Sequence, residues 1–449
     1  MLSKNHAEKV LESVGPRRNS SYNMSGLFSK ANTRRLGVLW SVVIVVGLFT
    51  THWVLILPSI GMAGLFVTSV SYAIANKQVA QRAYIHAILS LTVVYWMHFF
   101  VGLWHNSLFD KELRKDLVLQ LPFLLLPLSF LLLPTWQTSH KRIVWSVVIG
   151  CCLISATAAT TNYLLHAKEI VGAYDRSQVM PTQPDHVRLS ILISIALLAG
   201  CILLLDKTLA IGWRFAIGLG IGLLFLFQHL LAVRSGLLSL YVGGSLLVVG
   251  IGWQLKRWKM AALSVVFVLG FGAGCFLLLP TLQLRIHNTF YDTMQRKAVS
   301  SANNFSVTAR LYSYEVAEAI IKQHPLLGVG KVQLEQEMAQ QYSYRYPEIS
   351  VNNYLLPHNQ FIYNLASYGV IGLIMFLYGF YYALWIGIKQ RNLLVMVVYT
   401  IITISFLTEY TLENNLGVVI GLFFSLLALA QTSVEKLDTV ALQGPAFDD

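Results

Sequence analysis

Long apolar stretches separated by short polar connections occupy most of the chain. A helix needs about 20 apolar residues to cross the hydrocarbon core of a bilayer. About twelve stretches approach this length, and we interpret each as a membrane-spanning helix. The first two are nearly continuous, with only Thr50, Thr51 and His52 at their junction, so a single long span there stays an alternative. The stretches are residues 36–50, 52–74, 84–104, 117–133, 143–166, 187–205, 209–227, 236–253, 261–280, 359–388, 393–407 and 416–430.

One long polar segment, residues 281–358, interrupts this pattern late in the chain. Within it, residues 306–323 have helical periodicity, and Pro325 lies just beyond them. We expect Asn304 or Ser306 to cap this helix, which could lie on the membrane surface, and a second short helix over 331–341. The expected apolar stripe of the first helix is Val307, Leu311, Tyr314, Ala317 or Ala319, Ile320 and Ile321.

The composition agrees with a membrane protein. Hydrophobic residues make up 55% of the chain and charged residues 12%, whereas soluble domains carry about 25% charged residues. The expected fold class is therefore an all-α integral membrane protein in contact with membrane lipids. The formal net charge is +12, but no basic run interleaves with aromatic residues outside the membrane, so we expect no nucleic-acid partner.

The basic residues predict which side of the membrane each connection faces. Cytoplasmic loops of membrane proteins are enriched in lysine and arginine. With a cytoplasmic N-terminus, the segment 281–358 lies outside, where the loops mix acids and bases. The inside loops then contain Lys77, Arg82, Lys141, Arg142, Lys207, Lys256, Arg257, Lys259, Lys389 and Arg391.

The expected organisation follows from these assignments. It comprises a cytoplasmic tail (1–35), nine spans (36–280), a large periplasmic loop (281–358), three spans (359–430) and a second cytoplasmic tail (431–449). Residues 1–32 lack an apolar core, so they are not a cleavable signal peptide.

The small residues within the spans have structural interpretations. The four cysteines, which lie in apolar stretches without Cys-x-x-Cys spacing, predict neither a disulfide framework nor a metal site. Glycines four apart, Gly218/Gly222 and Gly270/Gly274, predict close helix packing.

Three arginines are candidates for binding an anion at the outer membrane surface. Arg234 is expected at the end of the outside loop 228–235, and Arg310 lies near the start of the loop helix, one turn before Tyr314. Arg188, at the outer end of another span, is a weaker candidate. A guanidinium binds phosphate oxygens in two-pronged fashion and stays charged. The alternatives are snorkelling toward lipid headgroups for Arg234 and a solvated helix face for Arg310.

His358, followed by Asn359, is the candidate for proton transfer. It stands where the long loop returns to the membrane, and a histidine titrates near neutral pH, so it can accept a proton from a hydroxyl. A helix cap is the alternative. Gly328 and Gly330 permit close approach of a ligand to the backbone, or simply end the helix. No acid or second histidine follows His358 at helical spacing and no Asp-x-Asp occurs, so we expect no metal.

Tyrosines are concentrated near the end of the long loop. Their flat faces suit stacking on sugar rings, and an interfacial aromatic belt is the equally acceptable alternative. They are Tyr342, Tyr344, Tyr346 and Tyr354.

Taken together, the order of these motifs resembles the O-antigen ligase and polymerase superfamily of the bacterial inner membrane. The resemblance rests on Arg234-Ser235-Gly236 opening a span, Arg310 on a loop helix, the run His324-Pro325-Leu326-Leu327-Gly328-Val329-Gly330, and His358-Asn359-Gln360 leading into a span.

The resemblance implies a multi-pass enzyme with a GT-C-like fold and a periplasmic active site. It implies inverting, metal-independent transfer of O-antigen from undecaprenyl diphosphate to lipid A–core oligosaccharide, without a cofactor. His358 would activate the acceptor hydroxyl, and Arg234 and Arg310 would bind the diphosphate, with Arg188 as a third candidate. Tyr314, Asn359, Gly328 and Gly330 would contribute to substrate binding.

A single large outer loop favours a ligase over two relatives. O-antigen polymerases often carry two sizeable periplasmic loops, and O-linked protein oligosaccharyltransferases often add a soluble C-terminal region. A lipid or glycolipid transporter is the alternative outside enzymes. The gathering of ionic residues at one face of the spans disfavours it, because transporters place polar residues at mid-membrane.

Overall fold

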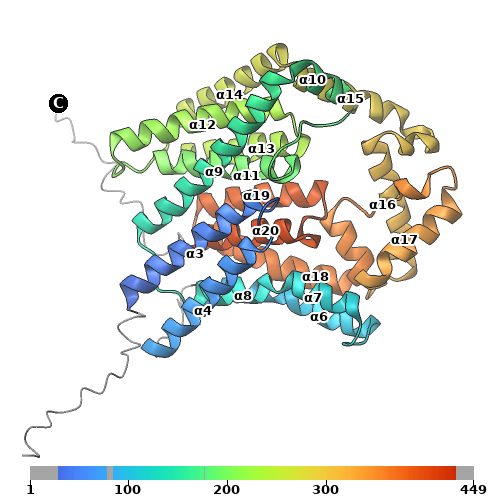
Figure 1. Cartoon of the computed structure of the whole chain (residues 1–449), viewed down its shortest axis with the longest axis horizontal. Coiled ribbons are helices and arrows are strands. Elements are labelled where there is room, and N and C mark those ends of the chain that lie inside the picture. Colours follow the sequence, from blue (N-terminus) through green and yellow to red (C-terminus); the bar gives the residue numbers. More distant parts are fainter. Residues whose placement is uncertain (1–28, 78–83, 176, 431–449) are drawn as a thin grey trace, which may run out of the picture.

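The structure is a computed structural model that describes residues 29–77, 84–175 and 177–430 (Figure 1). Every regular element in these ranges is helical. The expected tail 431–449, most of the expected tail 1–35 and the predicted cytoplasmic Arg82 lie outside the described residues.

The helices that precede the long polar segment extend from α3 to α14. Their bounds are α3 (Lys30–Thr50), α4 (Leu57–Asn76), α5 (Ile85–Ser90), α6 (Thr92–His105), α7 (Lys111–Gln120), α8 (Pro122–Leu132), α9 (Thr138–Leu165), α10 (Ala167–Asp175), α11 (His186–Leu204), α12 (Ile211–Leu231), α13 (Arg234–Leu255) and α14 (Trp258–Leu278).

The remaining elements form the long segment and the C-terminal helices. They are α15 (Pro280–Met294), η2 (Gln295–Lys297), η3 (Val299–Asn303), α16 (Ser306–Gln323), α17 (Lys331–Arg345), η4 (Val351–Asn353), α18 (Gln360–Lys389), α19 (Leu393–Thr408), η5 (Thr411–Glu413) and α20 (Asn415–Leu429).

Ten helices in the described ranges are long and apolar enough to cross a membrane. Two of them are formed by adjoining elements, α5 with α6 and α7 with α8. The last two expected spans coincide with shorter apolar helices, α19 of 16 residues and α20 of 15. A multi-pass membrane protein is therefore the architecture, and a count of twelve crossings stays a prediction.

The first two spans form a helical hairpin, so the alternative of one long span is wrong. Residues 51–56 turn the chain between α3 and α4, which pack against each other. Glycines make the approach close: a Cβ built on Gly61 would lie 2.7 Å from Ile44, and one on Gly64 would lie 2.4 Å from Trp40. Helix α3 begins at Lys30, ahead of the expected start at Leu36, because Ser29 caps it.

The expected packing of Gly218/Gly222 and Gly270/Gly274 is wrong. A Cβ on any of these four glycines would meet no heavy atom within 4 Å. Small residues allow close packing but do not choose the neighbour, and α14 lies at the edge of the bundle with little of its surface covered. Helix α11 lies inside the bundle, where it packs against α9, α12, α13 and α19.

The long segment is mostly helical and lies at one end of the bundle (Figure 1). The sequence prediction of a helix over 306–323 is confirmed by α16, and the second loop helix extends to Arg345. The expected cap is wrong, because the carboxylate of Asp292 in α15 accepts hydrogen bonds from the backbone N–H groups of Val307 (2.7 Å) and Thr308 (3.1 Å).

The buried face of α16 agrees with the expected stripe in its second half, where Ala317, Ala319 and Ile320 are buried, and differs from it in the first half. Tyr312 and Val316 point into a small core shared with α17, whereas Leu311 stays 36% exposed. Hydrophobic residues occur on both faces of this helix, so the sequence alone does not determine which face is buried. Packing against α17 determines it.

A kink in α18 holds the turn that follows α16. Gly369 interrupts the helix with φ 64°, and the freed carbonyls accept hydrogen bonds from this turn. Val329 donates to the carbonyl of Ala366 (3.1 Å) and Gly330 to that of Ser367 (2.9 Å). The turn therefore packs directly on the α18 backbone, where a side chain at position 328 would not fit.

Candidate active site

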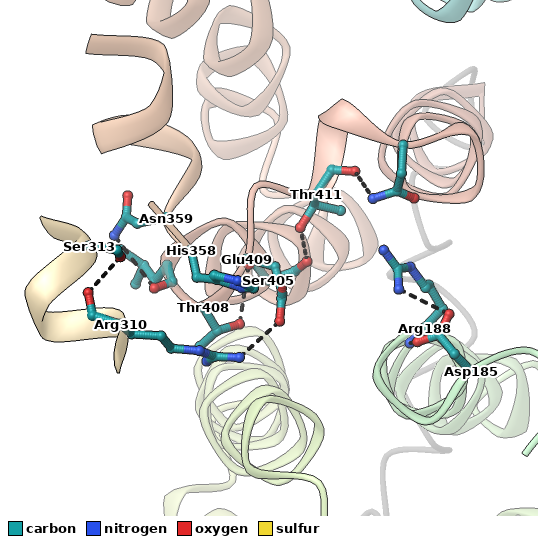
Figure 2. Close-up of polar contacts among 12 residues, drawn as sticks. Asp185, Arg188, Arg310, Ser313, His358, Asn359, Ser405, Thr408, Glu409 and Thr411 are labelled. Carbon is teal, nitrogen blue, oxygen red and sulfur yellow. Dashed lines mark hydrogen bonds and ion pairs between the residues drawn. The ribbon is translucent and has the colours of Figure 1, made fainter. Parts of the chain in front are cut away.

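His358 and Arg310 meet on a single carboxylate, that of Glu409 (Figure 2). The Nδ1 atom of His358 lies 2.9 Å from Oε2 of Glu409, and a guanidinium nitrogen of Arg310 lies 3.0 Å from Oε1. The three side chains are between 19% and 34% exposed, so the cluster is half-buried but reachable. Two residues that the sequence predicted for one site are thus joined by a third that it did not predict.

The local sequence explains how His358 is held. Asn359 caps α18 through hydrogen bonds from Phe361 and Ile362 to its side-chain oxygen (2.9 and 3.2 Å), which leaves His358 just outside the helix with its side chain free to turn toward Glu409. The hydroxyl of Tyr314 donates to the carbonyl of His358 (3.0 Å). The helix cap, which was the alternative role for His358, is therefore formed by Asn359.

Glu409 lies in the connection between α19 and α20, directly after the end of α19. Burial raises the pKa of this carboxyl, but the hydrogen bond and charge of His358, followed by the charges of Arg310 and Arg188, lower it below its usual value. Glu409 is consequently ionised at neutral pH and can accept from both neighbours at once.

Arg188 lies on the other side of Glu409 from Arg310 (Figure 2). It opens α11 and pairs with Asp185 (3.0 Å), whose carboxylate also caps that helix. Its charge acts on Glu409 and on Tyr410. Arg188 therefore lies close enough for its charge to act on the cluster, although no direct contact joins it to His358 in the described ranges.

Arg234 is the first residue of α13, directly after a tight turn at Ala232 and Val233. The expected outside loop 228–235 is thereby corrected, because α12 continues to Leu231 and only two residues separate the helices. Arg234 lies within electrostatic reach of Arg285 and Arg310. The turn fixes Arg234 at the rim of the bundle, facing the long loop.

Arg285 is a fourth arginine of the site, and sequence reasoning missed it as a site residue. It comes from α15 and donates to the carbonyl of Ser177 (3.0 Å). Burial lowers the pKa of its guanidinium, and the charge of Arg310 adds to that effect. The Nε atoms of Arg285 and Arg234 are both buried and make no hydrogen bond within the described ranges.

This arrangement concentrates guanidinium groups around a histidine–carboxylate pair. When Nδ1 of His358 carries the proton shared with Glu409, the Nε2 atom is left unprotonated and can act as a base. Buried guanidinium donors without an acceptor favour an anionic ligand. The cluster is therefore suited to taking a proton from a neutral group next to a bound anion.

A pocket of about 700 Å³ adjoins this cluster through Tyr314. Its walls combine tyrosine rings and aliphatic side chains with charged groups of both signs. Such a lining can accept the apolar face of a sugar ring and bond its hydroxyls. It is formed by Arg296, Lys297, Leu311, Tyr312, Tyr314, Glu315, Glu318, Ile321 and Ile362.

Gly328 and Gly330 lie away from this cluster. Both have positive φ, and a Cβ on Gly328 would lie 2.5 Å from the backbone of Ser367, while one on Gly330 would lie 3.1 Å from His105. The close approach that they permit is to neighbouring helices, and a contribution to substrate binding stays a prediction.

The tyrosines near the end of the long loop differ in their surroundings. Tyr342 is buried and stacks on Tyr354, with ring centroids 4.5 Å apart, whereas Tyr344 is 85% exposed. Tyr346 packs against Tyr312 and bonds Glu315, so it supports the wall of the pocket.

Comparison with known proteins agrees with this geometry. No curated protein sequence matches the chain. Residues 219–377 match the family described as O-antigen ligase, a range that includes Arg234, Arg285, Arg310 and His358 but neither Arg188 nor Glu409. The match over this segment supports an assignment to the O-antigen ligase family.

Proposed function

We propose that the protein is an O-antigen ligase that transfers a glycan from undecaprenyl diphosphate to lipid A–core oligosaccharide at the periplasmic face of the inner membrane. Members of the family are glycosyltransferase-like enzymes, ligases or polymerases, that use lipid-linked glycans. The observation that carries the proposal is the 2.9 Å contact between His358 and Glu409 beside four arginines.

In the proposed reaction, Nε2 of His358 removes the proton from a hydroxyl of the acceptor sugar. The hydroxyl oxygen forms a bond to the anomeric carbon of the donor glycan, and the bond from that carbon to the diphosphate oxygen breaks. The electron pair leaves with the diphosphate. Glu409 stabilises the imidazolium that forms. A single displacement of this kind inverts the configuration at the anomeric carbon.

The arginines bind the diphosphate and stabilise the charge that it gains as it departs. Arg234 and Arg285 have buried donors to offer, and Arg310 is held in place by the contact of one guanidinium nitrogen with Glu409. Preorganised positive charge of this kind can replace a metal ion at a leaving group, so the proposed reaction is metal-independent.

The pocket beside Tyr314 accommodates a sugar residue of the glycan. Its volume of about 700 Å³ lies within the range of small-molecule sites, about 300–1,000 Å³. Because one wall carries the tyrosine that bonds the His358 carbonyl, a sugar there would lie next to the base.

The proposal is tested with purified protein, undecaprenyl-diphosphate glycan and lipid A–core. Glycan should appear on lipid A–core in the complete mixture, and the donor should stay unchanged when acceptor is omitted. Elongation of the donor in the absence of acceptor would instead identify a polymerase. Transfer to neither, with or without acceptor, would contradict both.

His358→Ala separates an enzyme from a transporter. The variant should lose glycan transfer but still bind the lipid donor, because the arginines remain. Unchanged transfer by this variant would remove His358 from the mechanism. Movement of the donor across vesicle membranes without glycan transfer by the wild type would support a transporter.

A further inference from the structure

A second cluster of charged residues lies buried outside the arginine site. Lys331, the first residue of α17, inserts its ammonium between the carboxylates of Asp116 in α7 and Glu413 in η5. Its Nζ atom lies 2.5 Å from an oxygen of each. The side chains of Asp116 and Glu413 are only 5% and 3% exposed, and that of Lys331 is 18% exposed.

The cluster extends into the bundle through α6 and α18. Nδ1 of His98 lies 2.9 Å from the other carboxylate oxygen of Asp116, and the hydroxyl of Tyr368 lies 2.8 Å from the same nitrogen. Lys331 therefore joins a helix of the long loop directly to α7 and η5 and, through Asp116 and His98, to α6 and α18.

Gln360 links this cluster to the base. It is separated from His358 only by Asn359, and its side-chain nitrogen donates to Glu413 (3.1 Å) while its side-chain oxygen accepts from the backbone N–H of Leu412 (2.8 Å). Hydrogen bonds of Gln360 thus link the start of α18, two residues after His358, to the connection that contains Glu409. The carbonyl of Leu412 in turn accepts a hydrogen bond from the side chain of Gln120, the last residue of α7 (2.9 Å).

The positive charge of Lys331 stabilises the two buried carboxylates on either side of it. Two carboxylates buried close together repel each other and are costly to desolvate, and a cation between them removes both penalties. Burial lowers the pKa of Lys331, but Glu413 and Asp116 outweigh it and raise the pKa above its ordinary value. The ammonium is therefore charged at neutral pH.

We propose that Lys331 is a positioning residue for glycan transfer, because its ammonium holds the Glu409–Glu413 connection against the start of α18 and so sets the contact between Glu409 and His358. The inference rests on the proposed function. It assigns Lys331 no contact with substrate, and its effect passes through Glu409.

Lys331→Met should lower kcat by about 10²-fold with little change in the KM of either substrate, because a small displacement of a reacting group costs about that much. Lys331→Arg, which keeps the charge, should recover part of the rate. Lys322→Met is the matched control, since that lysine is exposed and pairs with Glu318 within α16. A wild-type kcat in Lys331→Met would overturn the inference.

A double-mutant cycle tests whether Lys331 acts through Glu409. Glu409→Gln alone should lower kcat, and adding Lys331→Met to it should produce no further fall. If the two losses multiply, Lys331 acts independently of Glu409 and the inference is wrong.

The variant Lys331→Met/Glu413→Gln keeps the test decisive if Lys331→Met does not fold. It removes the unpaired buried charge, so the melting temperature should approach that of the wild type while kcat stays low, because the connection is no longer held. Recovery of kcat together with the melting temperature would show a purely structural role. A wild type that transfers no glycan, or a His358→Ala variant that transfers glycan at the full rate, would instead refute the proposed function.

Discussion

Glu409 shares one carboxylate between His358 and Arg310, although 51 residues separate it from His358 and 99 from Arg310. The proposed proton acceptor and one of the proposed diphosphate ligands are therefore held by a single side chain. We expect a change at Glu409 to affect both proposed roles, which distinguishes it from a residue that supports only one.

Glu409→Gln should lower kcat by on the order of 10²-fold or more, because the amide cannot stabilise an imidazolium as a carboxylate does. Steady-state rates of glycan transfer to lipid A–core measure this. Thr408→Val is a neighbouring control, since the partners of its hydroxyl among the described residues are backbone carbonyls of its own helix. A wild-type rate in Glu409→Gln would exclude the pair from the mechanism.

The pH dependence of stability provides a second measurement on the same carboxyl. The pKa of Glu409 in the folded protein lies below its ordinary value of 4.5, so its stabilising contribution is present above that value. The contribution is lost as the pH falls through the lower, folded pKa. Melting temperatures of the wild type and Glu409→Gln should differ at neutral pH and converge below about pH 4, near the unperturbed range of the carboxyl. A constant difference over this range would contradict the assignment.

Arg285→Gln should raise the KM for the lipid-diphosphate donor by about tenfold or more, because a hydrogen bond to a charged group contributes about 1.5–3 kcal/mol. The KM for lipid A–core should change little. The control is Arg345→Gln, an exposed arginine of α17 that bonds Gln341. Equal effects on both substrates would indicate a general disturbance of α15 and no specific contact with phosphate.

Leu311→Trp should fill the pocket between α16 and η2 and raise the KM of the substrate whose sugar enters it. Titrating donor and acceptor separately shows which one that is. Lys322→Trp places the same bulk on the same helix outside the pocket lining. Unchanged KM values for both substrates in Leu311→Trp would exclude the pocket as a glycan site.

Tyr344→Cys should react with a membrane-impermeant thiol reagent from the periplasm of intact cells, in a background without the native cysteines. Tyr344 is 85% exposed on α17, so access depends only on the side of the membrane. Lys77→Cys, on the opposite side by the charge distribution, should react only after lysis. The reverse pattern would invert the proposed topology.

The hydrophobic pattern predicted the helices well because each apolar stretch has to cover a similar thickness of lipid. It placed most spans within a few residues of helices such as α11 and α13. Helix ends were predicted less well. Helix α12 continues through Gln228 and His229, whose side-chain nitrogens form hydrogen bonds inside the bundle, so these polar residues do not end the helix.

The site was predicted in part. Arg310 and His358 stand out because each is polar where the chain meets the membrane, and both prove to lie in one cluster. Glu409 was missed because it is one of two acids in a short outer loop, and nothing in the sequence distinguishes it from Glu413 or relates it to His358. Arg285 was missed because the long segment was treated as a polar loop, so the direction in which α15 presents it was unknown.

The long segment contains a hydrophobic core of its own, built mainly from α16 and α17 and separate from the core of the bundle. Val316, Ile320, Leu334 and Met338 are buried there. Tyr312 belongs both to this core and to the lining of the pocket. Substitutions that reshape the proposed sugar site can therefore be absorbed within the long segment, without repacking the helices that lie in the lipid.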